Sequence, residues 1–73
     1  MKVNYYADLL RLKEKYLMII RQRTKVLGEL VEKALKREDD IIEGLIQTES
    51  EQIMRLTAKV EAINECIQII INN

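Results

Sequence analysis

Two runs of apolar residues spaced as heptads dominate this sequence, and no proline interrupts either run. Over residues 5–35 and again over residues 40–71, apolar positions recur at alternating intervals of four and three, the spacing of helices that pack lengthwise. Residues 36–40 between them read KREDD and contain no apolar side chain. The pattern predicts an all-α fold, a coiled-coil-like antiparallel two-helix hairpin. We expect a helix over residues 4–36, a turn at 37–40 and a helix over 41–71, in a single domain of residues 1–73.

The first helix carries two apolar stripes side by side, whereas a hairpin needs only one. We expect the first stripe to face the second helix; it comprises Tyr6, Leu10, Lys13, Leu17, Ile20, Thr24, Leu27, Val31 and Ala34. The neighbouring stripe would then face away from the hairpin as a contiguous apolar patch, which monomers rarely expose. We therefore predict a partner-binding surface formed by Leu9, Leu12, Tyr16, Ile19, Val26 and Leu30.

The small size of the chain indicates what covers this surface. A chain of 73 residues buries a modest core, so it either packs very regular helices or gains buried area by oligomerising. Self-association into a homodimeric four-helix bundle is the first expectation. A groove for another protein's amphipathic helix is the second, and the two uses are compatible.

The two halves of the chain carry opposite charges. Residues 1–37 hold 10 basic and 4 acidic side chains, a net charge of +6, and residues 38–73 hold 2 and 8, a net charge of −6. Opposite charges along the flanks favour pairing of the two helices with each other and penalise parallel pairing of either with its own copy. Overall neutrality, with basic residues scattered around the first helix, does not favour a nucleic-acid partner.

The composition predicts that the protein is not an enzyme. It has no histidine and one cysteine, so the commonest general base and metal ligand are missing, and we expect no catalytic residues, no metal and no cofactor. We interpret the acidic residues near the turn as helix caps, with Asp40 and Glu43 forming a capping box. Cys66, close to Ile63 and Ile67, is interpreted as a small core or edge residue.

Glu49 is the plainly acidic member of the apolar stripe in the second helix. That stripe comprises Ile42, Ile46, Glu49, Ile53, Leu56, Val60, Ile63, Ile67 and Ile70. Glu49 is either an isolated buried acid or, as we favour, a polar layer that sets the helix register beside Thr24 and within reach of Arg23.

We expect no targeting segment and no contact with a membrane. Asn4 and Asp8 interrupt the apolar start of the chain, and the longest uninterrupted apolar run is residues 16–20. A membrane-spanning helix needs about 20 apolar residues. The sequence therefore predicts a cytoplasmic protein.

Residues 27–56 combine an apolar helix end, a charged turn and a helix that restarts after it. The positions that mark this order are Ala34-Leu35, Leu45-Ile46, Glu49, Ile53 and Leu56. The stretch resembles the helix–turn–helix core of the small flagellar export chaperones of the FlgN and FliT type. The resemblance implies an antiparallel helical protein that shields an amphipathic helical segment of a flagellar or secreted partner in the cytoplasm, through its apolar helix faces.

The length, the heptads and the turn also resemble those of Rop-like RNA regulators, which are helical hairpins that dimerise into four-helix bundles. That resemblance implies a homodimer whose basic first helix binds RNA. A purely structural assembly subunit is the third interpretation. Binding that weakens as salt concentration rises, measured by gel shift, would distinguish the RNA regulator from the other two.

Overall fold

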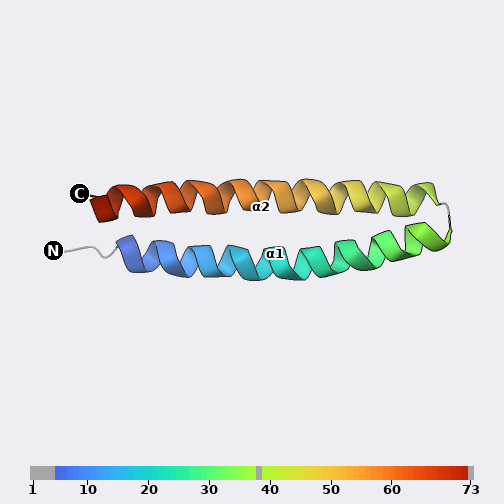
Figure 1. The fold of residues 1–73 in the computed structure, drawn as a ribbon, viewed down its shortest axis with the longest axis horizontal. Coiled ribbons are helices and arrows are strands. Elements are labelled where there is room, and N and C mark those ends of the chain that lie inside the picture. The colour runs from blue at the N-terminus through green and yellow to red at the C-terminus, as the bar shows by residue number, and fades with distance from the viewer. Residues whose placement is uncertain (1–4, 38, 73) are drawn as a thin grey trace.

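The computed structural model describes residues 5–37 and 39–72, which form an antiparallel hairpin of two long helices (Figure 1). Helix α1 spans Tyr5–Lys36 and helix α2 spans Asp40–Asn72, and the described part of the chain contains no strand. The predicted all-α hairpin is confirmed, with both helix boundaries near their expected positions. The predicted first residue of the first helix, Asn4, lies outside the described residues.

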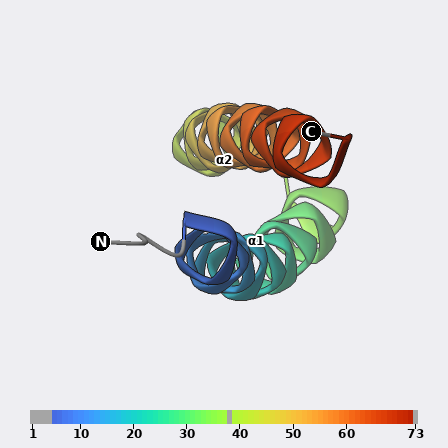
Figure 2. The ribbon, with the colours of Figure 1, turned by 90° about the vertical axis from the view of Figure 1, so that its left-hand side faces the viewer.

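The hairpin is a rod measuring 58 × 16 × 15 Å. The start of α1 and the end of α2 lie at one end of the rod, and the connection between the helices lies at the other (Figure 1). Viewed from the end, the two helices form a single layer, with nothing stacked on either side of them (Figure 2). Every residue of the hairpin is therefore close to its surface.

The side chain of Asp39 caps the start of α2. Its Oδ1 accepts a hydrogen bond from the backbone N–H of Ile41 at 2.9 Å, and its carbonyl oxygen accepts one from the N–H of Glu43 at 3.1 Å. Both bonds are those of an N-cap residue. The prediction that Asp40 caps the helix is therefore wrong by one residue. With Asp39 as the cap, Ile42 takes the third helical position, so Glu43 is out of frame for a capping box.

The core of the hairpin is thin and lies toward the end that carries the termini. Among the described residues, only Val60, Ile63 and Ile67 are buried, and all three belong to α2. The apolar stripe predicted for α2 is confirmed over its first eight positions, which are buried or partly buried. Its last member, Ile70, is 41% exposed because it lies in the final turn of the helix.

Helix α1 meets α2 along a row that takes residues from both predicted stripes. This row, here called the seam of α1, consists of the partly buried residues Leu9, Lys13, Tyr16, Ile20, Arg23, Leu27, Leu30 and Ala34. The expectation that the first stripe alone faces α2 is wrong, since its members Leu10, Thr24 and Val31 are exposed. The two stripes of α1 are almost equally apolar. Helix α2 packs over the boundary between them and so covers part of each stripe.

Candidate partner-binding surface

The seam leaves an apolar row on each side of α1. The isoleucine flank consists of Tyr5, Leu12, Ile19 and Val26, and the leucine flank consists of Leu10, Leu17, Thr24 and Val31. Members of each flank are seven residues apart, so they lie in one line along the helix. Ile19 and Leu17 are partly buried, whereas the other members of both flanks are exposed.

The structure separates the six predicted partner-binding residues into two groups. Leu9, Tyr16 and Leu30 lie in the seam and are partly buried against α2. The others, Leu12, Ile19 and Val26, belong to the isoleucine flank, in which Leu12 and Val26 are exposed. Reasoning from sequence missed the leucine flank, because nothing in the hydrophobic pattern distinguishes a flank position from a seam position when both are apolar.

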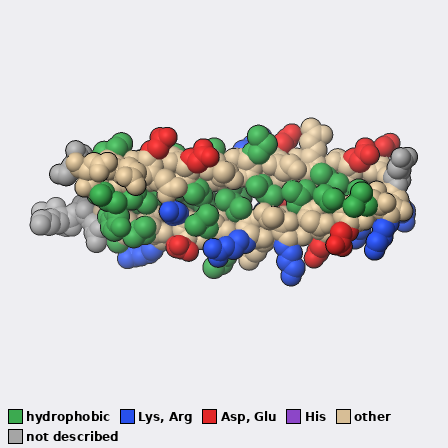
Figure 3. All heavy atoms as spheres, viewed as in Figure 1, with side chains coloured by type: hydrophobic (Ala, Val, Ile, Leu, Met, Phe, Trp, Pro, Cys, Tyr) green, Lys and Arg blue, Asp and Glu red, His purple; other side chains and the backbone are tan. Residues whose placement is uncertain are grey.

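Hydrophobic side chains run along the junction of the two helices on the face shown in Figure 3. They gather most densely toward the end that carries the termini, while most charged side chains occupy the outer edges of the rod. Large exposed side chains at that end include Tyr5, Ile69 and Ile71. The apolar surface therefore continues outward from the core rather than forming a separate patch.

The exposed area of the hairpin is large for its mass. The chain exposes 6138 Å². A folded monomer of 8.6 kDa exposes about 4,700 Å² by the usual scaling of surface with mass. The hairpin therefore leaves roughly 1,400 Å² more in water than a compact monomer of its size would.

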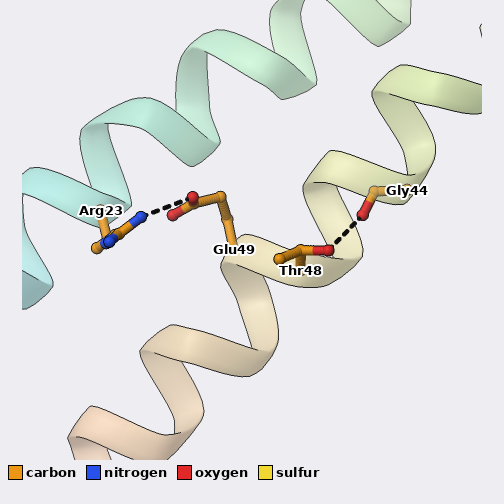
Figure 4. Close-up of polar contacts among 4 residues, drawn as sticks. All are labelled: Arg23, Gly44, Thr48 and Glu49. Carbon is orange, nitrogen blue, oxygen red and sulfur yellow. Dashed lines mark hydrogen bonds and ion pairs between the residues drawn. The ribbon is translucent and has the colours of Figure 1, made fainter.

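A polar layer crosses the apolar contact between the helices near its middle. The Arg23 guanidinium donates a hydrogen bond from Nη1 to Oε1 of Glu49 at 2.9 Å (Figure 4). The Arg23 side chain is 42% exposed and that of Glu49 only 15%. The second oxygen of Glu49, Oε2, is buried without a hydrogen-bond partner among the described residues. Arg23 is thus the partner expected for Glu49, whereas Thr24 donates instead to the backbone carbonyl of Ile20 at 2.7 Å.

A second long-range contact places the rows of α2 relative to those of α1. The ammonium group of Lys59 lies 5.4 Å from the centre of the Tyr16 ring, a cation–π contact. In antiparallel helices, equivalent flanks lie on the same side of the seam. The row Leu45, Gln52, Lys59 and Cys66 therefore adjoins the isoleucine flank, and we call this whole face the isoleucine side. The row Glu43, Ser50, Thr57, Asn64 and Ile71 adjoins the leucine flank.

Most basic residues of α1 lie either in its seam or on its outer, exposed face. Arg23 is paired with Glu49, and Arg11 lies 3.7 Å from Asp8 of its own helix. Lys13 belongs to the seam, while Lys15, Arg21 and Lys25 lie on the face of α1 opposite the seam, which they share with the exposed Glu14, Glu29 and Glu32. The outer face of α1 therefore carries charges of both signs.

The turn end of the rod has an open hollow of about 420 Å³. It is lined by Lys33, Lys36, Arg37, Asp39 and Ile42. Its charges are of both signs, and Asp39 is already engaged in capping α2. Within residues 5–37 and 39–72, no group of three or more acidic or cysteine side chains is arranged to hold a metal.

Comparisons with known proteins identify no relative of this chain. No family model, curated protein or solved structure matches the chain. Neither described helix has a stretch that is both long and apolar enough to cross a membrane. The strongest guide to function is therefore the uncovered apolar surface of α1.

Proposed function

We propose that this protein is a small helical binding protein that accepts a helix of another polypeptide against the isoleucine flank of α1. One observation carries this proposal: α1 has no buried residue along its 32 described positions, although both of its flanks are apolar. Helix-in-groove recognition uses apolar side chains on the same face of successive helical turns. Leu12, Ile19 and Val26 provide such a row.

The specific role we propose is that of an export chaperone. Such a protein would shield an amphipathic segment of a flagellar or secreted partner in the cytoplasm until export. Support comes from the helix–turn–helix resemblance of residues 27–56 and from the unpaired apolar flank. The row of α2 beside that flank contains Gln52 and Lys59, which would border a bound helix with polar groups and favour acidic side chains at its edge.

Binding of model peptides tests this proposal. One fluorescent peptide is an amphipathic helix with an acidic polar face, and its control has the same composition in an order that breaks the helical period. We expect micromolar binding of the amphipathic peptide by fluorescence anisotropy, and at least about tenfold weaker binding of its control.

Two neighbouring residues of α1 supply matched variants for the same assay. Ile19→Asp places a carboxylate on the flank and should weaken binding at least about tenfold, whereas Met18→Asp alters a 60% exposed side chain outside both flanks and should not. Equal binding of the two peptides, or unchanged binding by Ile19→Asp, would contradict the proposed function. A salt-sensitive gel shift with RNA, lost in Arg21→Ala and Lys25→Ala, would instead support the Rop-like alternative.

A further inference from the structure

The uncovered surface of the hairpin matches what a second copy of the chain would bury. A standard protein–protein interface removes about 800 Å² from each partner. The surplus exposure of roughly 1,400 Å² per chain, spread over the whole rod, is larger than the area that such an interface would cover. A second hairpin also has the right length, because both rods are 58 Å long and each flank covers about 32 Å of that distance.

The charges of the helices determine which helices would meet. Helix α1 holds 8 basic and 4 acidic residues, a net charge of +4, whereas α2 holds 2 basic and 6 acidic residues, a net charge of −4. Contact of α1 with its own copy would oppose like charges. Contact of α1 with α2 of the second copy pairs opposite charges along both edges of the interface. Complementary charge therefore favours a four-helix bundle in which the two α1 helices lie diagonally opposite each other, as do the two α2 helices.

The isoleucine side is the better of the two faces for this contact. Its row from α2 includes two apolar or weakly polar residues, Leu45 and Cys66, which are both exposed. The corresponding row on the leucine side consists of Glu43, Ser50, Thr57, Asn64 and Ile71, and only Ile71, in the last turn of α2, is apolar. Burial of the isoleucine side thus covers more apolar surface and fewer polar groups.

The polar layer indicates how the two copies are oriented. Arg23 and Glu49 each adjoin the isoleucine side of the seam, and Glu49 Oε2 is buried without a donor. If both turns lie at the same end of the bundle, the layers of the two copies reach the same level, and an Arg23 side chain can approach the Glu49 of the other copy. This orientation also makes every pair of neighbouring helices antiparallel, which suits their dipoles.

We propose that a second copy of this chain covers the isoleucine side, forming a four-helix bundle with both turns at the same end and α1 packed against α2 of the other copy. The Arg23 and Glu49 side chains of both copies form one layer of four charges within this bundle. The inference rests on the proposed function in one respect, that the isoleucine flank accepts a helix, so a helix of another polypeptide and the second copy exclude each other there.

Two valines of α1 provide a matched pair of variants for testing the proposal. Val26 on the isoleucine flank is 43% exposed, and Val31 on the leucine flank is 41% exposed. Sedimentation equilibrium should show a wild-type dimer of twice 8.6 kDa. Val26→Asp should raise the dimer dissociation constant about 100-fold or more, since each interface would hold two unpaired carboxylates. Val31→Asp should leave it within about threefold of wild type.

The results that would overturn the proposal are distinct. A monomeric wild type, a larger oligomer, or dissociation by Val31→Asp would each rule out a dimer through the isoleucine side. So would a Val26→Asp variant that stays dimeric. Circular dichroism of each variant checks that a change in oligomer size is not caused by loss of folding. Val31→Asp is the matched control because it introduces the same charge into the same helix.

A spin label at the turn end tests the orientation of the copies. Lys36→Cys in a Cys66→Ala background, which keeps a small apolar side chain at position 66 and is first checked for wild-type size by sedimentation equilibrium, places one label per chain at the end of α1. Lys36 lies about 24 Å from the middle of the helix at 1.5 Å per residue, so turns at opposite ends would separate the labels by roughly 48 Å. Turns at the same end would hold them within about 35 Å, the width of a four-helix bundle with its labels. A distance near 48 Å by pulsed electron paramagnetic resonance would overturn the proposed orientation.

The two proposals can fail separately. A monomer that binds the amphipathic peptide through Ile19 would remove the second copy and keep the binding function. A dimer that depends on Val26 but does not bind the peptide would support the proposed dimer and contradict the proposed binding function. It would favour the structural assembly subunit over the export chaperone.

Discussion

Helices α1 and α2 are nearly equal in length, at 32 and 33 residues, but they differ in how many neighbours their surfaces suit. In the middle of α2, one apolar row is bordered by polar residues such as Ser50, Gln52 and Thr57. That helix supplies all three buried side chains of the described residues. Helix α1 has an apolar flank on either side of its seam and contributes no buried side chain along its described length. The difference shows that α1 leaves more apolar surface uncovered beside its seam than α2 leaves beside its apolar row.

The largest expected effect concerns the buried row of α2. Ile63 is 7% exposed and Ile69 is 62% exposed, although both are isoleucines in the same part of one helix. Ile63→Asp buries an unpaired carboxylate and should destabilise the hairpin by about 3–5 kcal/mol, comparable to the whole stability of a small domain. Circular dichroism should show loss of helix for Ile63→Asp and little change for Ile69→Asp. A well-folded Ile63→Asp variant would show that α2 does not supply the core.

The next effect concerns the polar layer that joins the two helices. Glu49→Leu should stabilise the fold by about 1–4 kcal/mol, because an apolar side chain avoids burying the unpartnered Oε2. Arg23 is 42% exposed in the single hairpin, so its charge stays hydrated there when its partner is removed, whereas in the bundle the two Arg23 side chains would lose both carboxylates of the layer. The register should loosen, giving a mixture of oligomer sizes in sedimentation velocity.

An exposed glutamate two residues away gives the control for that variant. Glu51→Leu should change the melting temperature little, because Glu51 is exposed and bonded only to Gln47 of its own helix at 3.4 Å. A lower melting temperature for Glu49→Leu with unchanged oligomer size would contradict the interpretation of Glu49 as a register-setting layer.

A smaller effect tests how α2 begins. Asp39→Ala removes the side-chain oxygen that accepts from Ile41, and it should lower the free energy of unfolding by about 1 kcal/mol. Asp40→Ala, one residue further on, removes a carboxylate near the same helix end and should cost only about 0.3–0.5 kcal/mol through the helix dipole. Urea titration measures both, and equal losses would argue against Asp39 as the cap.

The smallest effect compares the two helices at their glycines. A Cβ added to Gly28 of α1 or to Gly44 of α2 would meet no atom within 4 Å, so alanine at either position should stabilise its helix by up to about 1 kcal/mol. Thermal melts should show similar gains for both variants. A loss at Gly28 alone would reveal another chain packed closely against that part of α1.

The sequence by itself determined those features of the fold for which only one arrangement buries apolar side chains and keeps polar ones exposed or paired. It predicted two long helices because no proline and no polar break interrupts either heptad run. The apolar row of α2 was predictable for the same reason, since rotating that helix would bury Ser50, Gln52 or Thr57 instead of isoleucine. The contact of Glu49 with Arg23 also followed from the sequence, because a carboxylate in an apolar row needs a cation within reach.

Only the tertiary structure decided between alternatives of nearly equal free energy. Two apolar stripes on α1 offered α2 almost the same burial, and packing selected a seam between them, which exposed Leu10 and Val31 and drew in Leu9 and Leu30. Adjacent carboxylates at Asp39 and Asp40 offered the same capping chemistry, and the geometry of the turn selected the first. In both cases the sequence specifies the kind of contact, while the positions of the two helices in space specify which residue makes it.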